Sequence, residues 1–133
     1  MIVQYPVMRI IGLGFDATEI GRVDELIGRY GDRFLHRVFT ESEIAYCLAR
    51  RRSAQSFAAR FAAKEAAMKA LGTGHARGVT WRSIEVVRRL GPPQLMFHGA
   101  ARTRLAALHA DSALLTISHS VTLAFAQVVL LES

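Results

Sequence analysis

Three stretches of the sequence carry side chains suited to phosphate and metal chemistry. Asp16 lies in RIIGLGFDATEI, Glu65 and Lys69 lie in RFAAKEAAMKALGTG, and His119 lies in TISHS. Magnesium is typically held by one or two carboxylates together with waters and the phosphates of a substrate. A lysine ammonium can hold a phosphate as a point charge, and a histidine can bind phosphate or move a proton. These residue types predict a site for a divalent cation and a phosphorylated ligand.

The glycines around Asp16 allow a competing interpretation. Gly12, Gly14 and Ala17 have the Gly-x-Gly-x-x-Ala spacing of a dinucleotide-binding loop. Such a loop must open the helix of a βαβ unit, with an acidic residue about 20 positions further on. Here the first helix is followed by more helices, and Asp16 would place a negative charge beside the pyrophosphate. We therefore favour a metal-binding role for Asp16, with an N-cap before the helix as the alternative.

Glu65 and Lys69 are four residues apart in a predicted helix, so they share one face. Ala58 and Ala62 continue that face and leave room for a ligand. Glu65 could complete the metal site while Lys69 holds a phosphate. The alternative is an exposed Glu–Lys ion pair worth about 0.2–0.5 kcal/mol. For His119, a hairpin turn without a chemical role is equally compatible with the sequence.

The pattern of apolar residues and breakers predicts an α+β domain that positions these side chains. We expect elements in the order β-ααα-ββ-α-ββ, at about 9–14, 18–30, 41–50, 53–71, 79–88, 94–98, 99–110, 113–118 and 122–131. Thr40 and Glu43 form a capping box before the second helix. Gly72 ends the third helix, whose many alanines let a neighbouring element lie close.

Length and composition indicate a single domain spanning residues 1–133. Apolar residues make up 51% of the chain, yet no run approaches the roughly 20 that a membrane helix needs. We see no signal peptide, so we expect a cytoplasmic protein without a membrane partner. The single cysteine, Cys47, excludes a disulfide framework and a multi-cysteine zinc site, and we expect it to be buried on a helix.

The net charge of +6 suggests a polyanionic partner such as nucleic acid, an acidic protein or a phosphorylated ligand. The chain has no basic strand interleaved with aromatic residues of the kind found in RNA-binding sheets. It also has no defensible helix-turn-helix pattern. We therefore expect no nucleic-acid partner, although a basic nucleic-acid-binding module and an inactive scaffold remain alternative functions.

Together these stretches resemble the holo-acyl-carrier-protein synthases, the small bacterial 4′-phosphopantetheinyl transferases. The segments similar to that family's blocks are GLGFDATEIGRV, RFLHRVFTESEIAYC, SFAARFAAKEAAMKALGTG and TISHS, whose usual form is SISHS. The resemblance covers nearly the whole chain and leaves residues 1–7 as a candidate N-terminal extension before Met8. It departs at VTLAFAQVV, which lacks the tyrosine often found after SHS.

The resemblance implies a transferase fold in which a small antiparallel sheet packs on a long helix. It also implies magnesium-dependent transfer of 4′-phosphopantetheine from coenzyme A to a serine of apo-acyl carrier protein, releasing adenosine 3′,5′-bisphosphate. Asp16 and Glu65 would hold the metal with the pyrophosphate, and Lys69 would contact a phosphate. Arg60 and His119 would belong to the coenzyme A site. The carrier could serve fatty-acid or polyketide synthesis.

The family is trimeric, with each site between two subunits, so His119 would face the Asp16/Glu65 pair of a neighbour. Arg22 and Leu26 are four residues apart on the first helix, giving one charged and one apolar contact on one face. Family members grip the acidic carrier with this helix, so we expect both residues to contact it. We also predict that Glu65, directly or through a metal-bound water, accepts the serine proton.

Overall fold

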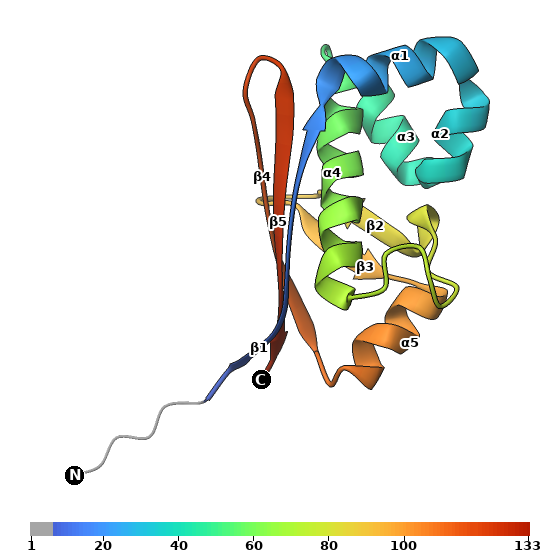
Figure 1. The fold of residues 1–133 in the computed structure, drawn as a ribbon. Helices are drawn as coiled ribbons and strands as arrows, with labels where there is room; N and C mark the ends of the chain where they lie inside the picture. Colours follow the sequence, from blue (N-terminus) through green and yellow to red (C-terminus); the bar gives the residue numbers. More distant parts are fainter. Residues whose placement is uncertain (1–6) are drawn as a thin grey trace.

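The computed structural model describes residues 7–133, and residues 1–6 of the candidate N-terminal extension lie outside the described part. The chain forms an α+β fold, as predicted (Figure 1). Its elements are β1 (Arg9–Glu19), α1 (Ile20–Tyr30), α2 (Asp32–Val38), α3 (Glu41–Leu48), α4 (Ser53–Leu71), the 3₁₀ turn η1 (Trp81–Ser83), β2 (Ile84–Val87), β3 (Gln94–Phe97), α5 (Gly99–Ala107), β4 (Ser112–His119) and β5 (Leu123–Glu132).

Two elements differ from the sequence-based expectation. The predicted turn at RYGDRF contains the start of an additional helix, α2, which is separated from α1 only by Gly31 at φ +54°. Strand β1 continues to Glu19 because its antiparallel ladder with β5 extends that far. Asp16 therefore lies inside the strand, opposite Ala126, rather than after its end. This placement rules out the N-cap alternative, since the N-cap of α1 is Glu19.

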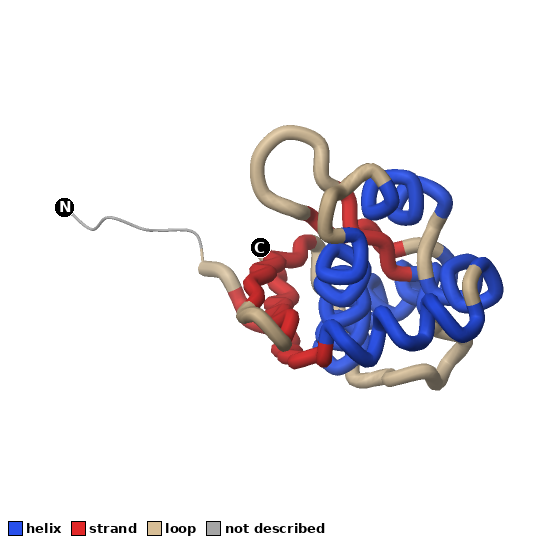
Figure 2. Tube along the Cα trace, turned by 90° about the horizontal axis from the view of Figure 1, so that it is seen from above, coloured by secondary structure: helices blue, strands red, loops and turns tan. Residues whose placement is uncertain are grey.

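A three-stranded antiparallel sheet with the order β1-β5-β4 lies against one side of α4, and the other helices lie beyond it (Figures 1 and 2). Gly12 and Gly14 allow very close contact: an added Cβ would lie 2.3 Å from the Ala70 carbonyl oxygen and 1.8 Å from that of Ala66. The prediction that the alanines of this helix admit a close neighbour is confirmed. The backbone carrying Asp16 is thus held directly against the helix that carries Glu65 and Lys69.

A second apolar cluster joins α1, α2 and α3 to the N-terminal half of α4, with Val23, Phe39 and Phe57 almost completely buried. Cys47 is part of this cluster, and burial raises the pKa of its thiol to about 11, which agrees with the predicted structural role. The predicted capping box of Thr40 and Glu43 is present at the start of α3. Among the helices of residues 7–133, none is both long and apolar enough to cross a membrane.

Candidate active site

Asp16 and Glu65 both line a cavity of about 250 Å³ that opens between β1, α1 and α4. We call this cavity the acidic pocket, and its other relevant lining residues are Thr18, Arg22, Leu26 and Phe61. The two predicted metal ligands are therefore brought together from positions far apart in the sequence. The same pocket contains Arg22 and Leu26, the two residues predicted to contact an acidic carrier.

Asp16 is held from two sides. Thr18 Oγ1 donates a hydrogen bond to Asp16 Oδ2 at 2.7 Å. Lys69 Nζ lies 3.1 Å from Asp16 Oδ1 and also donates to the Phe15 carbonyl oxygen at 2.9 Å. Lys69 thus pairs with Asp16, and the expected alternative of a surface pair between Lys69 and Glu65 is wrong. The Asp16 carboxylate is only 16% exposed, so its orientation is well defined.

Glu65 lies in the same pocket without a comparable set of partners. Within residues 7–133, no side chain or backbone group forms a hydrogen bond with its carboxylate. Burial, and then the negative charge of Asp16, raise the pKa of Glu65, and the positive charges of His75 and Lys69 oppose that rise. A cation bound between the two carboxylates would relieve this repulsion.

The donor set fits magnesium better than a metal that requires a complete protein cage. No cluster of three or more histidine, cysteine, aspartate or glutamate side chains occurs in the described part of the chain. Structural zinc needs about four such ligands. Magnesium commonly uses one or two carboxylates and takes its remaining ligands from water and substrate phosphates. Asp16 and Glu65 supply that number.

Arg60 and His119 line a second cavity of about 400 Å³, between α3, α4, β4 and the connection from β2 to β3. We call it the basic pocket, and Tyr46, Arg88 and Ser118 also line it. Arg60 is only 5% exposed, and its guanidinium carbon lies 4.1 Å from the centre of the Tyr46 ring. One of its nitrogens donates to the Ser56 carbonyl oxygen, while Nε is a buried donor without an acceptor in residues 7–133.

Positive charge is concentrated around Tyr46. Arg50 stacks on its ring at 4.3 Å and donates to its hydroxyl oxygen. Burial raises the pKa of the Tyr46 hydroxyl, but the bond from Arg50 and the charges of Arg50, Arg60 and Arg88 outweigh burial and lower it. An unpaired buried guanidinium nitrogen beside further arginines indicates a site for an anion such as a phosphate.

The two pockets are separate within one chain. Asp16 is on β1 and His119 is on β4, the two edge strands of the sheet. His119 and Thr18 lie on either side of Ala124 of β5, so about 10 Å separates their backbones. The pockets share no lining residue. The seven predicted site residues therefore form two groups: Asp16, Glu65, Lys69, Arg22 and Leu26 in one, and Arg60 and His119 in the other.

Several residues of these pockets were not predicted, among them Thr18, Tyr46 and Arg88. Thr18 lies two positions after Asp16 on the same strand, and the twofold periodicity of strands places both on one face. That spacing would have identified Thr18 if β1 had been predicted at its full length. Tyr46 and Arg88 are far from Arg60 in sequence and meet it only through the tertiary fold. No local signal marks them.

The family model described as the 4′-phosphopantetheinyl transferase superfamily matches residues 12–126. The chain belongs to this superfamily. The resemblance inferred from the sequence blocks is thereby confirmed. The matched span includes every predicted site residue of this transferase, from Asp16 to His119.

Curated relatives of the transferase are named holo-[acyl-carrier-protein] synthase. The one from Koribacter versatilis is 48% identical over 122 residues, which cover 91% of this chain and 98% of the relative. The one from Maricaulis maris is 56% identical over 100 residues, covering 74% and 70%. High identity over most of both chains accounts for the shared family blocks.

Solved structures of holo-[acyl-carrier-protein] synthases have the same fold as this transferase. The Neisseria meningitidis structure matches with a TM-score of 0.84 at 30% identity, over 92% of this chain and 98% of that one. The Bacillus anthracis structure, a complex with coenzyme A (3′,5′-ADP), matches with a TM-score of 0.77 at 35% identity, over 96% and 100%. These matches confirm the predicted transferase fold.

Proposed function

We propose that this chain transfers 4′-phosphopantetheine from coenzyme A to a serine of an apo-acyl carrier protein and releases adenosine 3′,5′-bisphosphate. The meeting of Asp16 and Glu65 in the acidic pocket, with Lys69 paired to Asp16, carries the proposal, because these are the groups a pyrophosphate displacement needs. The names of the relatives and the coenzyme A complex of the Bacillus anthracis protein support the substrates. We propose that residues 1–133 act as one transferase domain in the cytoplasm.

Magnesium is part of the proposal. Asp16 and Glu65 would hold the ion, which would neutralise charge on the pyrophosphate of coenzyme A. Thr18 keeps the Asp16 carboxylate in place through its 2.7 Å hydrogen bond. Lys69, whose side chain is 54% exposed, is free to contact a phosphate that approaches Asp16.

Glu65 is our candidate for the general base. In the displacement, the serine oxygen forms a bond to the β-phosphorus, and the bond from that phosphorus to the leaving adenosine bisphosphate breaks. The serine proton must be accepted as this happens. Both Asp16 oxygens already accept hydrogen bonds, whereas the Glu65 carboxylate in residues 7–133 accepts none. Glu65 therefore has a free oxygen to take the proton, directly or through a water.

Arg22 and Leu26, which line the acidic pocket, would bind the carrier. Leu26 also lines a neighbouring groove of about 250 Å³ with Tyr30 and Phe34, and the groove is flanked by Arg33 and Arg37. An apolar groove between arginines suits an acidic partner with an exposed apolar side chain. The positive net charge of the chain would speed the approach of an acidic carrier.

The sheet offers an interface for the proposed homotrimer. On the face away from α4, Leu13 is 60% exposed, Phe15 55% and Leu114 58%. Leu13 and Leu114 both lie opposite Val129, so the apolar side chains form a row across the strands. Large exposed apolar patches commonly mark protein interfaces. A trimer that covers this face would bring the basic pocket of one copy to the acidic pocket of the next.

Mass spectrometry of a carrier tests the function. Purified protein is incubated with apo-acyl carrier protein, coenzyme A and magnesium, and parallel samples contain a chelator or a carrier whose acceptor serine is replaced by alanine. We expect the carrier mass to increase by one phosphopantetheine only in the complete mixture. An unchanged mass across fatty-acid and polyketide carriers would reject the proposal. A salt-sensitive shift of nucleic acid in the same preparation would then favour the alternative binding function.

A further inference from the structure

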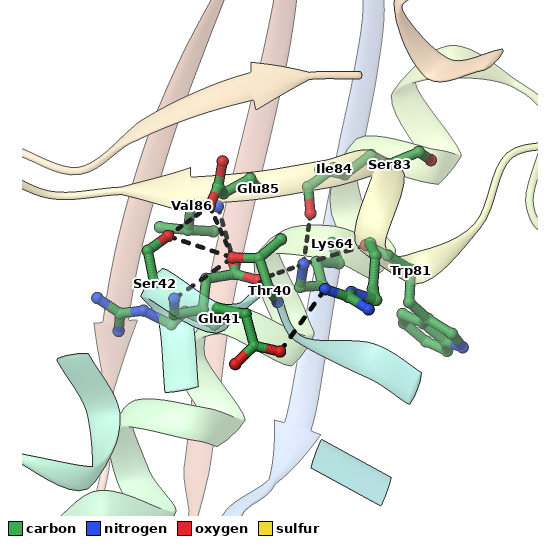
Figure 3. A network of polar contacts seen from close by, with 12 residues as sticks. Thr40, Glu41, Ser42, Lys64, Trp81, Ser83, Ile84, Glu85 and Val86 are labelled. Carbon is green, nitrogen blue, oxygen red and sulfur yellow. Dashed lines mark hydrogen bonds and ion pairs between the residues drawn. The ribbon is translucent and has the colours of Figure 1, made fainter. Parts of the chain in front are cut away.

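A buried ion pair outside both pockets joins four elements of the fold: α3, α4, η1 and β2. Glu43 Oε1 lies 2.8 Å from Lys64 Nζ, and neither side chain is exposed. Lys64 Nζ also donates to the carbonyl oxygens of Trp81, at 3.0 Å, and Ile84. Figure 3 shows Lys64 pointing from its helix towards these carbonyl groups. The three donors of the ammonium group are thus all used.

The carboxylate is equally well satisfied. Glu43 Oε1 accepts from the Thr40 backbone NH, and Glu43 Oε2 accepts from the Val86 backbone NH, both at 2.9 Å. Burial lowers the pKa of Lys64, and the charge of Glu43 opposes this. A buried ion pair often adds little stability compared with apolar residues of similar size, and its better-supported use is to specify one arrangement of the chain.

Helices α3 and α4, which the pair joins, both contribute lining residues to the basic pocket, as does β4, which the pair does not contact. Tyr46 follows Glu43 by three residues on α3, and Arg60 precedes Lys64 by four residues on α4, so each pocket residue shares a helix face with its partner in the pair. Arg88 follows β2 directly, two residues after Val86, whose backbone NH donates to Glu43.

The acidic pocket is connected to this arrangement less directly, through the contact of Phe61 with Trp81. Its lining residues come from β1, α1 and α4, and none comes from α3, η1 or β2. Gly12 and Gly14 of β1 are in close contact with Ala66 and Ala70 of α4, and these contacts fix Asp16 relative to Glu65. A change at the Glu43–Lys64 pair should therefore affect the two pockets unequally.

We propose that the Glu43–Lys64 ion pair is the positioning element of the basic pocket, holding Tyr46, Arg60 and Arg88 together around the phosphates of the coenzyme. The identity of that ligand rests on the proposed function, while the positioning role rests on the contacts of the pair. Neither Glu43 nor Lys64 touches the ligand; each acts through the neighbouring pocket residues.

The test compares steady-state kinetics and ligand binding in Glu43→Gln and Lys64→Met. We expect KM for coenzyme A to rise about tenfold or more in both variants, because a displacement near 1 Å at a binding group has effects of that size. We expect KM for the carrier and the magnesium concentration at half-maximal rate to change by less than about twofold. Met68→Ala, which removes a buried apolar side chain one helical turn after Lys64 and leaves both charges of the pair in place, is the control.

A purely structural role would lower the amount of active enzyme and leave KM for coenzyme A unchanged, as expected for Met68→Ala. An unchanged KM for coenzyme A in folded Glu43→Gln would overturn the proposal. An equal shift of KM for coenzyme A, KM for the carrier and the magnesium concentration at half-maximal rate would overturn it as well. For a variant that is only marginally stable, binding is measured by calorimetric titration of coenzyme A below the melting temperature of the protein. If coenzyme A binds to wild type and binds more weakly to Glu43→Gln, the positioning role is supported. If wild type fails to bind coenzyme A or to transfer phosphopantetheine, the proposed function is wrong instead.

Discussion

The two pockets are fixed by different kinds of interaction. The acidic pocket depends on shape: the glycines of β1 lie against the alanines of α4, and an added Cβ at Gly14 would lie 1.8 Å from a carbonyl oxygen. The basic pocket depends on charge: Glu43 and Lys64 form a fully buried pair that joins α3, α4 and β2. Helix α4 contributes to both, because Glu65 and Arg60 lie on different faces of it.

This difference has a physical consequence. Close backbone packing does not respond to pH or salt, and it fails when a side chain grows. A buried polar network tolerates small changes in volume, and it fails when one partner is lost and the other is left buried and unpaired. A larger side chain should therefore damage mainly the acidic pocket, whereas loss of one charged partner should damage mainly the basic pocket.

The largest effect is expected when the charge of the acidic pocket is removed. Glu65→Gln should lower kcat/KM by about 100-fold to 1,000-fold, which is typical for loss of one preorganised charge-stabilising group. The free energy of unfolding should stay the same or rise, because burial and the Asp16 charge disfavour the ionised carboxylate in the folded protein. Kinetics and urea unfolding measure both quantities. A variant that retains magnesium affinity and full turnover would disprove the base assignment.

The contact between β1 and α4 is the next target. Gly14→Ala should lower the free energy of unfolding by about 1–3 kcal/mol or more, because its Cβ would overlap the Ala66 carbonyl group. Gly28→Ala is a matched control on α1, since no atom lies within 4 Å of an added Cβ there. That control should be stabilised by about 0.5–1 kcal/mol. Equal stability of the two variants would refute the packing argument.

Carrier recognition should depend on the rim of the acidic pocket. Arg22→Glu should raise KM for the carrier about tenfold and leave KM for coenzyme A unchanged, because reversing one rim charge mainly affects docking. The effect should shrink as salt is added. Arg102→Glu, at an exposed position on α5 away from both pockets, is the control with the same change of net charge. An unchanged carrier KM in Arg22→Glu would reject the assignment.

The smallest effect concerns Glu85, which ties β2 to the start of α3. Burial raises the pKa of its carboxylate, but hydrogen bonds from Ser42, Thr40 and His98 outweigh burial and lower it from an ordinary 4.5 to about 2. Because the folded pKa is depressed, this stabilisation is present above about pH 4.5 and is lost as the pH falls towards 2.

Glu85→Gln should therefore lower the free energy of unfolding by about 1 kcal/mol at pH 7, and the difference from wild type should disappear near pH 2. Urea unfolding across this pH range measures it. The rate of the transfer reaction at pH 7 should stay near wild type, since Glu85 is not among the side chains assigned to the reaction. If the difference in the free energy of unfolding between Glu85→Gln and wild type stayed constant with pH, hydrogen bonds to the ionised Glu85 carboxylate would not be its cause.

The sequence predicted the acidic pocket better than the basic one. Asp16, Glu65 and Lys69 lie in distinctive blocks, and the alanine pattern of α4 already indicated a close neighbour. The contacts around Arg60 could not be predicted in the same way, because Tyr46, Arg88 and the Glu43–Lys64 pair meet only when separate elements pack. A lysine on an alanine-rich helix does not reveal from sequence that it is fully buried.

Similar limits apply to local structure. The capping box of Thr40 and Glu43 was predicted correctly, but its glutamate also binds Lys64, a role that local pattern could not show. Helix α2 was missed because its seven residues are too few for a clear period. Strand β1 was predicted too short because its final residues are extended by pairing with β5 rather than by their own propensity.

We propose that the acidic pocket of one copy and the basic pocket of another form one active site. Asp16→Asn damages the first pocket and Arg60→Glu the second, so each variant alone should be inactive. When the two are co-expressed with different tags and purified through both, every mixed ring of three contains one interface with both pockets intact. That preparation should therefore show about one third of wild-type carrier modification. A mixed preparation as inactive as either variant alone would contradict it.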